Sequence, residues 1–421
     1  MSEPIPLDLK KMTEFPVKFR MKEHQKKRVC GVEWREREED NESDKRPSKP
    51  EPIPFDVEVE ILTRLPVKSV MRSRCVSKMW SSIIRSQGFI DSYYAMSSAT
   101  RSRFVVVFSN GVCVDGVAQR LFIFSGEESS SSLVAANLDM TIPSLTMPHR
   151  AKCPSVHGFV GCCYYNRLSI CNPGTGQVVN LRSKGDRTSL GYDPVGQQFK
   201  ALTLLHCRGP HAYDGCTEHE IITLGGGESS RSKVTSRPYS PMTYGLCFNG
   251  FVYHGAWEPR QYTKPVIVCF DVRNEDFSFI TTPPDVLKWL GESDLIEYKG
   301  KLAAIVTHGS HMTFGGFDLW ILEDVKKEEW SRQSFVLPYT LVNMTCPGTN
   351  KAGEIVFAPK RLPLDSQPLF YLFYYNLQTK DMRRVRIQGV ADDQGFRLRY
   401  GLSGQCNVSV SLQHAESIAS L

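Results

Sequence analysis

Residues 53–84 have the sequence IPFDVEVEILTRLPVKSVMRSRCVSKMWSSII and predict a short helical unit ahead of a long β-rich region. Asp56 suits the cap of a first helix, because its carboxylate accepts hydrogen bonds from free backbone N–H groups. An apolar stripe at helical spacing follows: Phe55, Val59 and Leu62, broadened by Ile61 and Leu65. Pro66 ends this predicted amphipathic helix.

Two further helices are predicted in the same segment. Pro66 suits the first position of the second helix, which carries Val70. Ser77 can cap the third helix, in which Trp80 shares one face with two isoleucines before Gly88 ends it. So small a unit rarely buries enough surface to be stable alone. We therefore expect a second protein to complete its core.

Beyond residue 103 the helical period disappears and β-branched and aromatic runs take over. Asn-Gly pairs, which favour tight hairpin turns, occur at Asn110-Gly111 and Asn249-Gly250, with a similar turn at Lys299-Gly300. These signals predict an all-β domain built from hairpins.

A diffuse repeat runs through this region. Six apolar strand patterns end at residues 125, 172, 224, 271, 323 and 376, with a period of about 50 residues that is typical of a kelch-like propeller. We therefore expect about six blades, with residues 400–412 available for a closing strand. The architecture rests on the period alone, since neither the Trp-Asp nor the kelch consensus is present.

Composition narrows the classes of function. A net charge of +6 over 421 residues gives no concentrated basic face, which argues against nucleic-acid binding. No apolar run approaches the roughly 20 residues needed to cross a bilayer, and no signal peptide is recognisable. We expect an intracellular protein, cytoplasmic and/or nuclear, whose 13 cysteines are mostly free thiols. A basic stretch at 18–28 could act in nuclear import, although nearby acidic residues largely cancel it.

The helical segment resembles an F-box. The family pattern is an entry Leu-Pro, an Ile-Leu pair, Arg-Leu-Pro and then Arg-x-Arg-x-Val-x-Lys-x-Trp. The matching residues here are Pro54, Ile61-Leu62, Arg64-Leu65-Pro66, Arg72, Arg74, Val76, Lys78 and Trp80. Ile53 stands where Leu is usual, a volume-conserving change of small expected cost.

The β-rich region is similar to the F-box-associated domain (type 3-like) of plant F-box proteins. The stretches that carry this likeness are 172–176, 189–195, 244–257, 269–273, 298–302, 318–324 and 353–358. The two resemblances divide the chain into a disordered charged leader (1–50), an F-box (51–90), a linker (91–102), a β-propeller-like domain (103–395) and a C-terminal strand and tail (396–421).

The resemblance implies a non-catalytic substrate receptor of an SCF-type ubiquitin ligase. The F-box would bind a Skp-type adaptor and, through it, a cullin scaffold, while the β-domain would bind an unknown target protein. The residues implied to contact the adaptor are Pro54, Ile61, Leu62, Leu65, Pro66, Val70 and Trp80. For Trp80, a place in the motif's own core is an equally open alternative.

The sequence gives weaker indications of metal, catalytic and target-binding sites. Cys207, His211, Cys216 and His219 match no common zinc spacing, and no catalytic motif is present, so we expect neither a metal nor a cofactor. Loops at 206–219 and 307–316 are candidates for target binding. The alternative function is a propeller-type enzyme or carbohydrate-binding module with a helical cap, and a further one is an adaptor partner outside the ligase.

Overall fold

The computed structural model of the protein describes residues 53–111, 118–147, 151–164, 166–185, 187–205, 217–225, 229–258, 264–288, 293–310, 312–364, 369–393, 395–402 and 404–421. The predicted leader at 1–50 and three members of the Cys/His group, Cys207, His211 and Cys216, lie outside these residues. Residues 53–421 form one compact unit.

Four helices open the described chain: α1 (Phe55–Arg64), α2 (Val67–Ser73), α3 (Lys78–Arg85) and α4 (Gln87–Thr100). The first three occupy the segment predicted to be helical, and Ser77 caps α3 by accepting a hydrogen bond from the Trp80 amide. Three expectations were wrong. Helix α1 begins at Phe55 with Pro54 at its N-cap position, so Asp56 lies in the first turn and does not cap the helix. The third helix ends at Arg85 and not at Gly88, and most of the predicted linker at 91–102 is helix α4.

Helix α4 forms for reasons that its sequence carries. Ser86 ends α3 and caps α4, since its hydroxyl accepts a hydrogen bond from the Phe89 amide. Phe89, Tyr93 and Ser97 follow at i, i+4 and i+8 and are buried on one face. Gly88 is tolerated in the exposed first turn and does not act as a stop signal.

The β-domain contains five hydrogen-bonded sheets in the described residues. Four of them, in chain order, are β4 (Ser155–Val156), β5 (Phe159–Tyr164), β6 (Arg167–Cys171) and β7 (Val178–Arg182); β8 (Arg187–Asp193), β9 (Gln198–Leu204), β10 (Thr217–Leu224) and β11 (Ser230–Ser236); β12 (Ser240–Pro241), β13 (Leu246–Phe248), β14 (Phe251–Trp257), β15 (Pro265–Asp271) and β16 (Phe277–Thr281); and β17 (Ser293–Tyr298), β18 (Lys301–Gly309), β19 (Thr313–Asp324) and β20 (Glu329–Val342).

The fifth sheet has eight strands and joins the two ends of the domain. Its order is β21 (Met344–Thr349), β22 (Ile355–Pro359), β23 (Tyr371–Tyr375), β24 (Met382–Gln388), β3 (Leu133–Pro143), β2 (Arg120–Glu127), β1 (Arg103–Ser109) and β25 (Val408–Ser411). Two antiparallel groups of four meet at a parallel β24–β3 contact. Strand β25, which lies within the expected closing segment at 400–412, pairs with β1.

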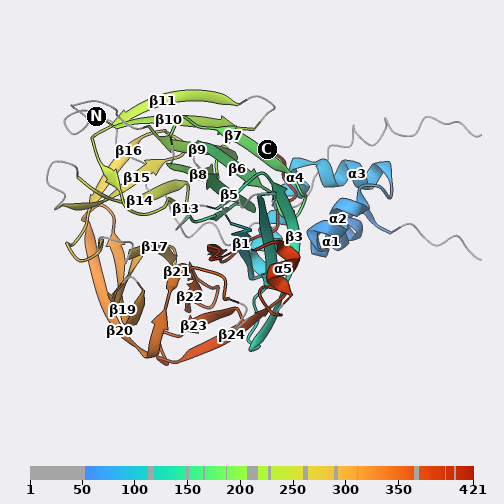
Figure 1. Ribbon diagram of the computed structural model, residues 1–421. Coiled ribbons are helices and arrows are strands. Elements are labelled where there is room, and N and C mark those ends of the chain that lie inside the picture. Colours follow the sequence, from blue (N-terminus) through green and yellow to red (C-terminus); the bar gives the residue numbers. More distant parts are fainter. Residues whose placement is uncertain are drawn as a thin grey trace, which may run out of the picture. The chain divides into compact units, whose positions relative to one another are not determined.

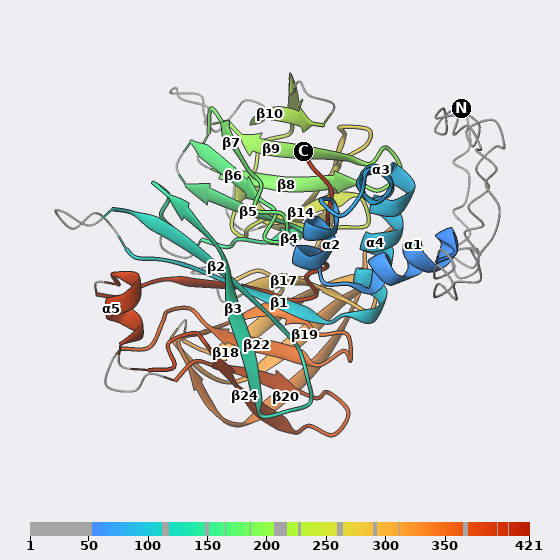
Figure 2. The ribbon, with the colours of Figure 1, turned by 90° about the vertical axis from the view of Figure 1, so that its right-hand side faces the viewer.

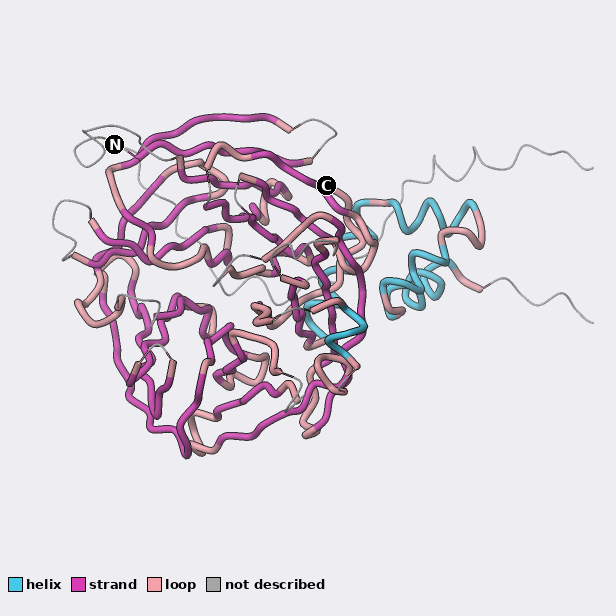
Figure 3. Tube along the Cα trace, in the orientation of Figure 1, coloured by secondary structure: helices cyan, strands magenta, loops and turns pink. Residues whose placement is uncertain are grey.

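The sheets are arranged around a common centre, as Figure 1 shows, and Figure 3 separates these strands from the helices at one side. Apolar clusters lie between neighbouring sheets; one joins Phe317 of β19 to Phe357 of β22 and Tyr375 of β23. The six repeat patterns read from the sequence fall in β2, β6, β10, β15, β19 and β23, the third strand of each successive group. The repeat is therefore structural.

The predicted turns are confirmed in part. Asn249-Gly250 and Lys299-Gly300 have positive φ at both residues, as a two-residue hairpin turn requires, and connect β13 to β14 and β17 to β18. Asn110-Gly111 instead opens a longer connection between β1 and β2, in which the Asn110 side chain bonds Ala118 and Arg120. Its side chain holds the two strand ends together.

Helix α5 (Phe396–Tyr400) and a C-terminal tail complete the chain. The nine cysteines of the described part are free thiols. Among the described helices, none has the length and apolar character needed to span a membrane. Figure 2 shows β8 running toward the side of the propeller that carries α3 and α4.

Candidate functional site

The helical module, residues 55–100, has its own apolar core. Leu62 of α1, Val70 of α2, Ile84 of α3 and Tyr93 of α4 are all almost completely buried and pack together. Ile418 from the C-terminal tail belongs to the same cluster. The sequence led us to expect that a second protein completes this core. Instead, the C-terminal tail of the same chain completes it in part.

The seven predicted adaptor contacts fall into two groups. Leu62 and Val70 are completely buried, and Leu65 and Trp80 are partly buried against the same core. Pro54 and Pro66 are exposed caps of α1 and α2, and Ile61 is 44% exposed. The exposed group offers the most surface to a partner without rearrangement, and Leu65 and Trp80 offer part of theirs.

Besides the predicted Ile61, four exposed apolar side chains were missed as possible contacts by sequence reasoning: Ile53, Val57, Val76 and Met79. Ile53, Val57 and Ile61 recur every four residues along α1 and its approach, and are 53%, 43% and 44% exposed. Val76 and Met79, near the start of α3, are 66% and 50% exposed. The sequence shows the four-residue spacing of Ile53, Val57 and Ile61. However, it also shows a second apolar stripe on the same helix that includes Leu62, and either stripe could have been the buried face.

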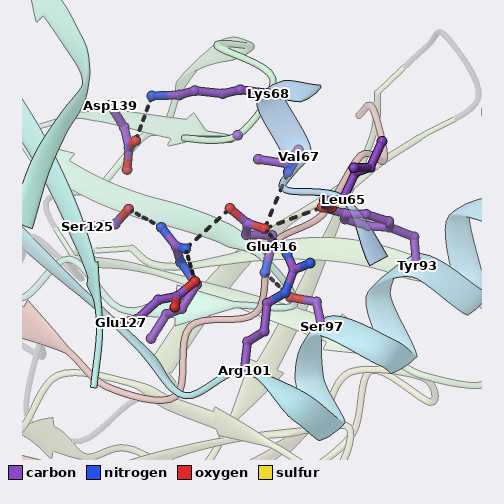
Figure 4. A network of polar contacts seen from close by, with 12 residues as sticks. Leu65, Val67, Lys68, Tyr93, Ser97, Arg101, Ser125, Glu127, Asp139 and Glu416 are labelled. Atoms are coloured by element: carbon purple, nitrogen blue, oxygen red, sulfur yellow. Dashed lines mark hydrogen bonds and ion pairs between the residues drawn. The ribbon is translucent and has the colours of Figure 1, made fainter. Parts of the chain in front are cut away.

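One carboxylate connects the module to the propeller and the tail (Figure 4). The Glu416 side chain, 7% exposed, accepts a 2.6 Å hydrogen bond from Arg101 at the end of α4 and lies 3.5 Å from Arg103 of β1. The Val67 amide at the start of α2 also donates to it, at 3.4 Å. The Glu416 amide donates to Ser97 Oγ at 2.8 Å. Glu416 therefore binds groups from two helices and the first strand.

Tyr93 closes this network. Its hydroxyl donates to the Leu65 carbonyl at 3.0 Å and lies 3.3 Å from Glu416 Oε2. Burial, with a smaller contribution from the Glu416 carboxylate, raises the pKa of this hydroxyl above its ordinary value. The phenol therefore stays protonated and able to donate.

Close packing supports the polar contacts. Val67 of α2 lies against Gly174, where an added Cβ would approach the Val67 side chain to 2.7 Å. Lys68 of α2 pairs with Asp139 of β3 at 2.8 Å. Tyr94 of α4 packs against His157, with 3.6 Å between ring centroids and a tilt of 31° between the rings. The module thus contacts the propeller over several separate areas, which fixes its orientation.

The other sequence candidates have mixed outcomes. No group of three or more potential metal ligands occurs in the described part of the chain. Of the 206–219 segment, 206–216 lie outside the described residues and 217–219 belong to β10. Most of 307–316 is strand and not loop, because β18 extends to Gly309 and β19 starts at Thr313.

Comparison with known proteins assigns both parts of the chain. Residues 52–92 match the F-box domain, and residues 103–415, more than half of the chain, match the F-box associated beta propeller domain. The chain is 50% identical over 392 residues to F-box protein At1g30790 of Arabidopsis thaliana, covering 87% of this chain and 97% of that protein. It is 46% identical over 377 residues to putative F-box protein At1g32660 of the same plant, covering 86% and 82%.

A solved propeller is only remotely similar. The β-propeller domain of the Trilobed protease from Pyrococcus furiosus is 13% identical, with 54% of this chain and 66% of that chain covered and a TM-score of 0.30.

A short helical F-box module followed by a β-propeller defines the class of protein. The chain belongs to the family of F-box proteins that carry the F-box associated beta propeller domain. Membership in this family supports a role in substrate recognition and suggests that the role is non-catalytic.

Proposed function

We propose that this protein is the substrate-recognition subunit of an SCF-type ubiquitin ligase. Its F-box would bind a Skp-type adaptor, which carries the cullin scaffold, and its propeller would bind a target protein. The observation that most directly supports this proposal is the exposed apolar surface at the helices, formed by Ile53, Val57, Ile61, Val76 and Met79. Exposed apolar groups gathered on one small module are typical of an interaction surface.

The mechanism is proximity and needs no chemistry from this chain. A target on the propeller and a charged conjugating enzyme on the scaffold would meet at high effective concentration. Such an arrangement works best when the two binding sites keep a fixed geometry. The contacts of Glu416 and the Tyr94–His157 ring contact support a fixed geometry here.

We further propose the finer architecture that this function requires. Helices α1 to α3 would form the adaptor-binding F-box, and the propeller would have six blades. Four separate sheets and the two four-stranded halves of the eight-stranded sheet support this count. The site of action would be the cytoplasm or nucleus, which the free thiols of the described residues fit.

Affinity capture tests the proposal. Wild-type protein should capture a Skp-type adaptor together with cullin, whereas Ile61→Asp combined with Met79→Asp should lose both. Both side chains are exposed, so the double variant should keep its fold, and an unchanged melting temperature would verify this. Leu398→Asp, on α5 with Leu398 88% exposed, is the matched control and should capture normally. Full adaptor capture by the double variant would overturn the proposed docking surface.

A further inference from the structure

A second candidate site lies in the propeller, between the β8–β11 sheet and the β12–β16 sheet. It is a cavity of about 240 Å³. Its lining comes from these two sheets and their connections, with Cys163 added by β5 of the β4–β7 sheet: Cys163, Arg187, Thr188, Ser189, Leu202, Leu204, His219, Tyr239, Pro241, Thr243, Tyr244, Gly245 and His254. None of the residues described above that join the helical module to the propeller lines this cavity.

The cavity lies far from the helices. The turn after β8 contacts α4 through Gln197, whose side chain bonds Asp91 and Gln87. The other end of β8 begins with Arg187, which lines the cavity. Six steps of about 3.3 Å separate Arg187 from Asp193, so the cavity opens roughly 20 Å from the module-bearing end. A group bound there would be accessible while the adaptor occupies the helices.

The lining is rich in nitrogen and hydroxyl groups. It contains Arg187, His219 and His254, together with several hydroxyls, and no carboxylate among the described lining residues. Arg187 is exposed and donates a 2.8 Å hydrogen bond to the Pro241 carbonyl, which is a neutral acceptor. Within the described part of the chain, Arg187 forms no ion pair that would neutralise it. A positive charge therefore faces the cavity.

The two histidines are held neutral. Burial lowers the pKa of His219 to about 4, and burial together with the smaller effect of the Arg187 charge lowers the pKa of His254 to about 4. His219 Nε2 lies 3.0 Å from the Tyr239 hydroxyl. Neutral imidazoles can form hydrogen bonds with a ligand but carry no charge. Arg187 is therefore the group that favours a negatively charged ligand over a neutral or positively charged one.

We propose that this cavity binds an anionic group of the target protein, a carboxylate or a phosphate on a single side chain. The volume suits one side chain, since it is below the roughly 300–1,000 Å³ of sites for drug-sized ligands. Arg187 would pair with the anion, as guanidinium groups do with both carboxylates and phosphates. This inference rests on the proposed function, because it assigns the site to the target of a substrate receptor.

Thermal shift and calorimetry on the full chain, alone and with the adaptor, test the inference. The probes are the N-acetyl amides of aspartate, phosphoserine and, as the uncharged control, asparagine. At least one anionic probe should raise the melting temperature at millimolar concentration while the asparagine probe does not. Arg187→Gln should weaken that binding about tenfold or more, since a charge-assisted hydrogen bond is lost. Comparing the shifts produced by the aspartate and phosphoserine probes shows whether the cavity prefers a carboxylate or a phosphate.

Arg120→Gln is the matched control, because Arg120 is exposed at the start of β2 and outside the cavity. It should leave binding unchanged. Equal shifts with all three probes, no shift with any, or equal losses in both variants would overturn the inference. Adaptor capture by Arg187→Gln separates the two proposals: retained capture with no anion binding removes only this inference, whereas absent capture by wild type removes the proposed function.

Discussion

Arg101 donates a 2.6 Å hydrogen bond from Nη1 to Glu416 Oε2, across 315 residues of sequence. The pair joins the last turn of the helical module to the C-terminal tail, and both side chains are largely buried. The far end of the chain thus holds the first domain in place. If the protein acts as the proposed receptor, this contact would help to set how the adaptor and the target are oriented.

Glu416→Gln should destabilise the protein by about 3 kcal/mol, because Arg101 and Arg103 lose the carboxylate that neutralises them in a largely buried site. Urea unfolding followed by Trp fluorescence measures the change. Glu127→Gln is the control within the same network, since Glu127 is 67% exposed and its pair with Arg103 should contribute less than about 1 kcal/mol. Equal effects of the two variants would contradict the role of Glu416.

Ile418→Ala should cost about 2–4 kcal/mol and loosen the helices first, because the tail residue is buried in their core. Hydrogen exchange should rise in α1 to α4 while the strands far from the tail remain protected. Leu398→Ala, at an exposed position, should change neither quantity. Protection unchanged in the helices of Ile418→Ala would show that the tail does not stabilise them.

Neighbouring residues of α1 should separate folding from docking. Leu62→Ala should lower stability by about 3 kcal/mol, because Leu62 is completely buried. Ile61→Ala should leave stability within about 0.5 kcal/mol yet weaken adaptor binding, because its side chain is 44% exposed. Calorimetric titration with the adaptor at a temperature where both variants are folded compares them. Stronger loss of binding in folded Leu62→Ala than in Ile61→Ala would contradict the assignment.

Stability should fall below neutral pH. Burial holds the pKa of His157, His219 and His254 at about 4, below the value near 6.5 of an unfolded histidine. The unfolded state therefore binds more protons between these values, so the stabilising contribution is complete above about pH 7 and is lost as pH falls toward 4. His219, which is completely buried, contributes up to about 3 kcal/mol to this change, and the partly buried His157 and His254 contribute less.

His219→Phe isolates one of these contributions. Phe keeps a ring beside Phe277, whose centroid lies 4.2 Å away, but it has no proton to bind. The free energy of unfolding measured from pH 7.5 to 4.5 should therefore fall less steeply in this variant. A slope as steep as that of the wild type would show that His219 does not contribute.

The sequence predicted elements well where local signals agreed. The repeat of about 50 residues located the third strand of each group, and Asn249-Gly250 marked a true hairpin turn. Helix α4 was missed because Gly88 was interpreted as a stop, although Ser86 and the spacing of Phe89 and Tyr93 carried a helix signal. The loop at 307–316 was mostly strand, because pairing with long neighbours overrides the weak strand propensity of its glycines.

By itself, the sequence determined the order of the parts: a helical module, then a repeating β-domain closed by its last strand. These properties follow from periodicity and turn chemistry, which are local. Tertiary structure alone decided that Leu62 lies inside while Ile61 faces out, that Glu416 meets Arg101, and that Arg187 and His254 line one cavity. The Glu416–Arg101 contact and the cavity lining join residues far apart in the chain, so no local pattern encodes them. For Leu62 and Ile61, a local stripe of apolar residues includes both, and only packing against the other helices decides between them.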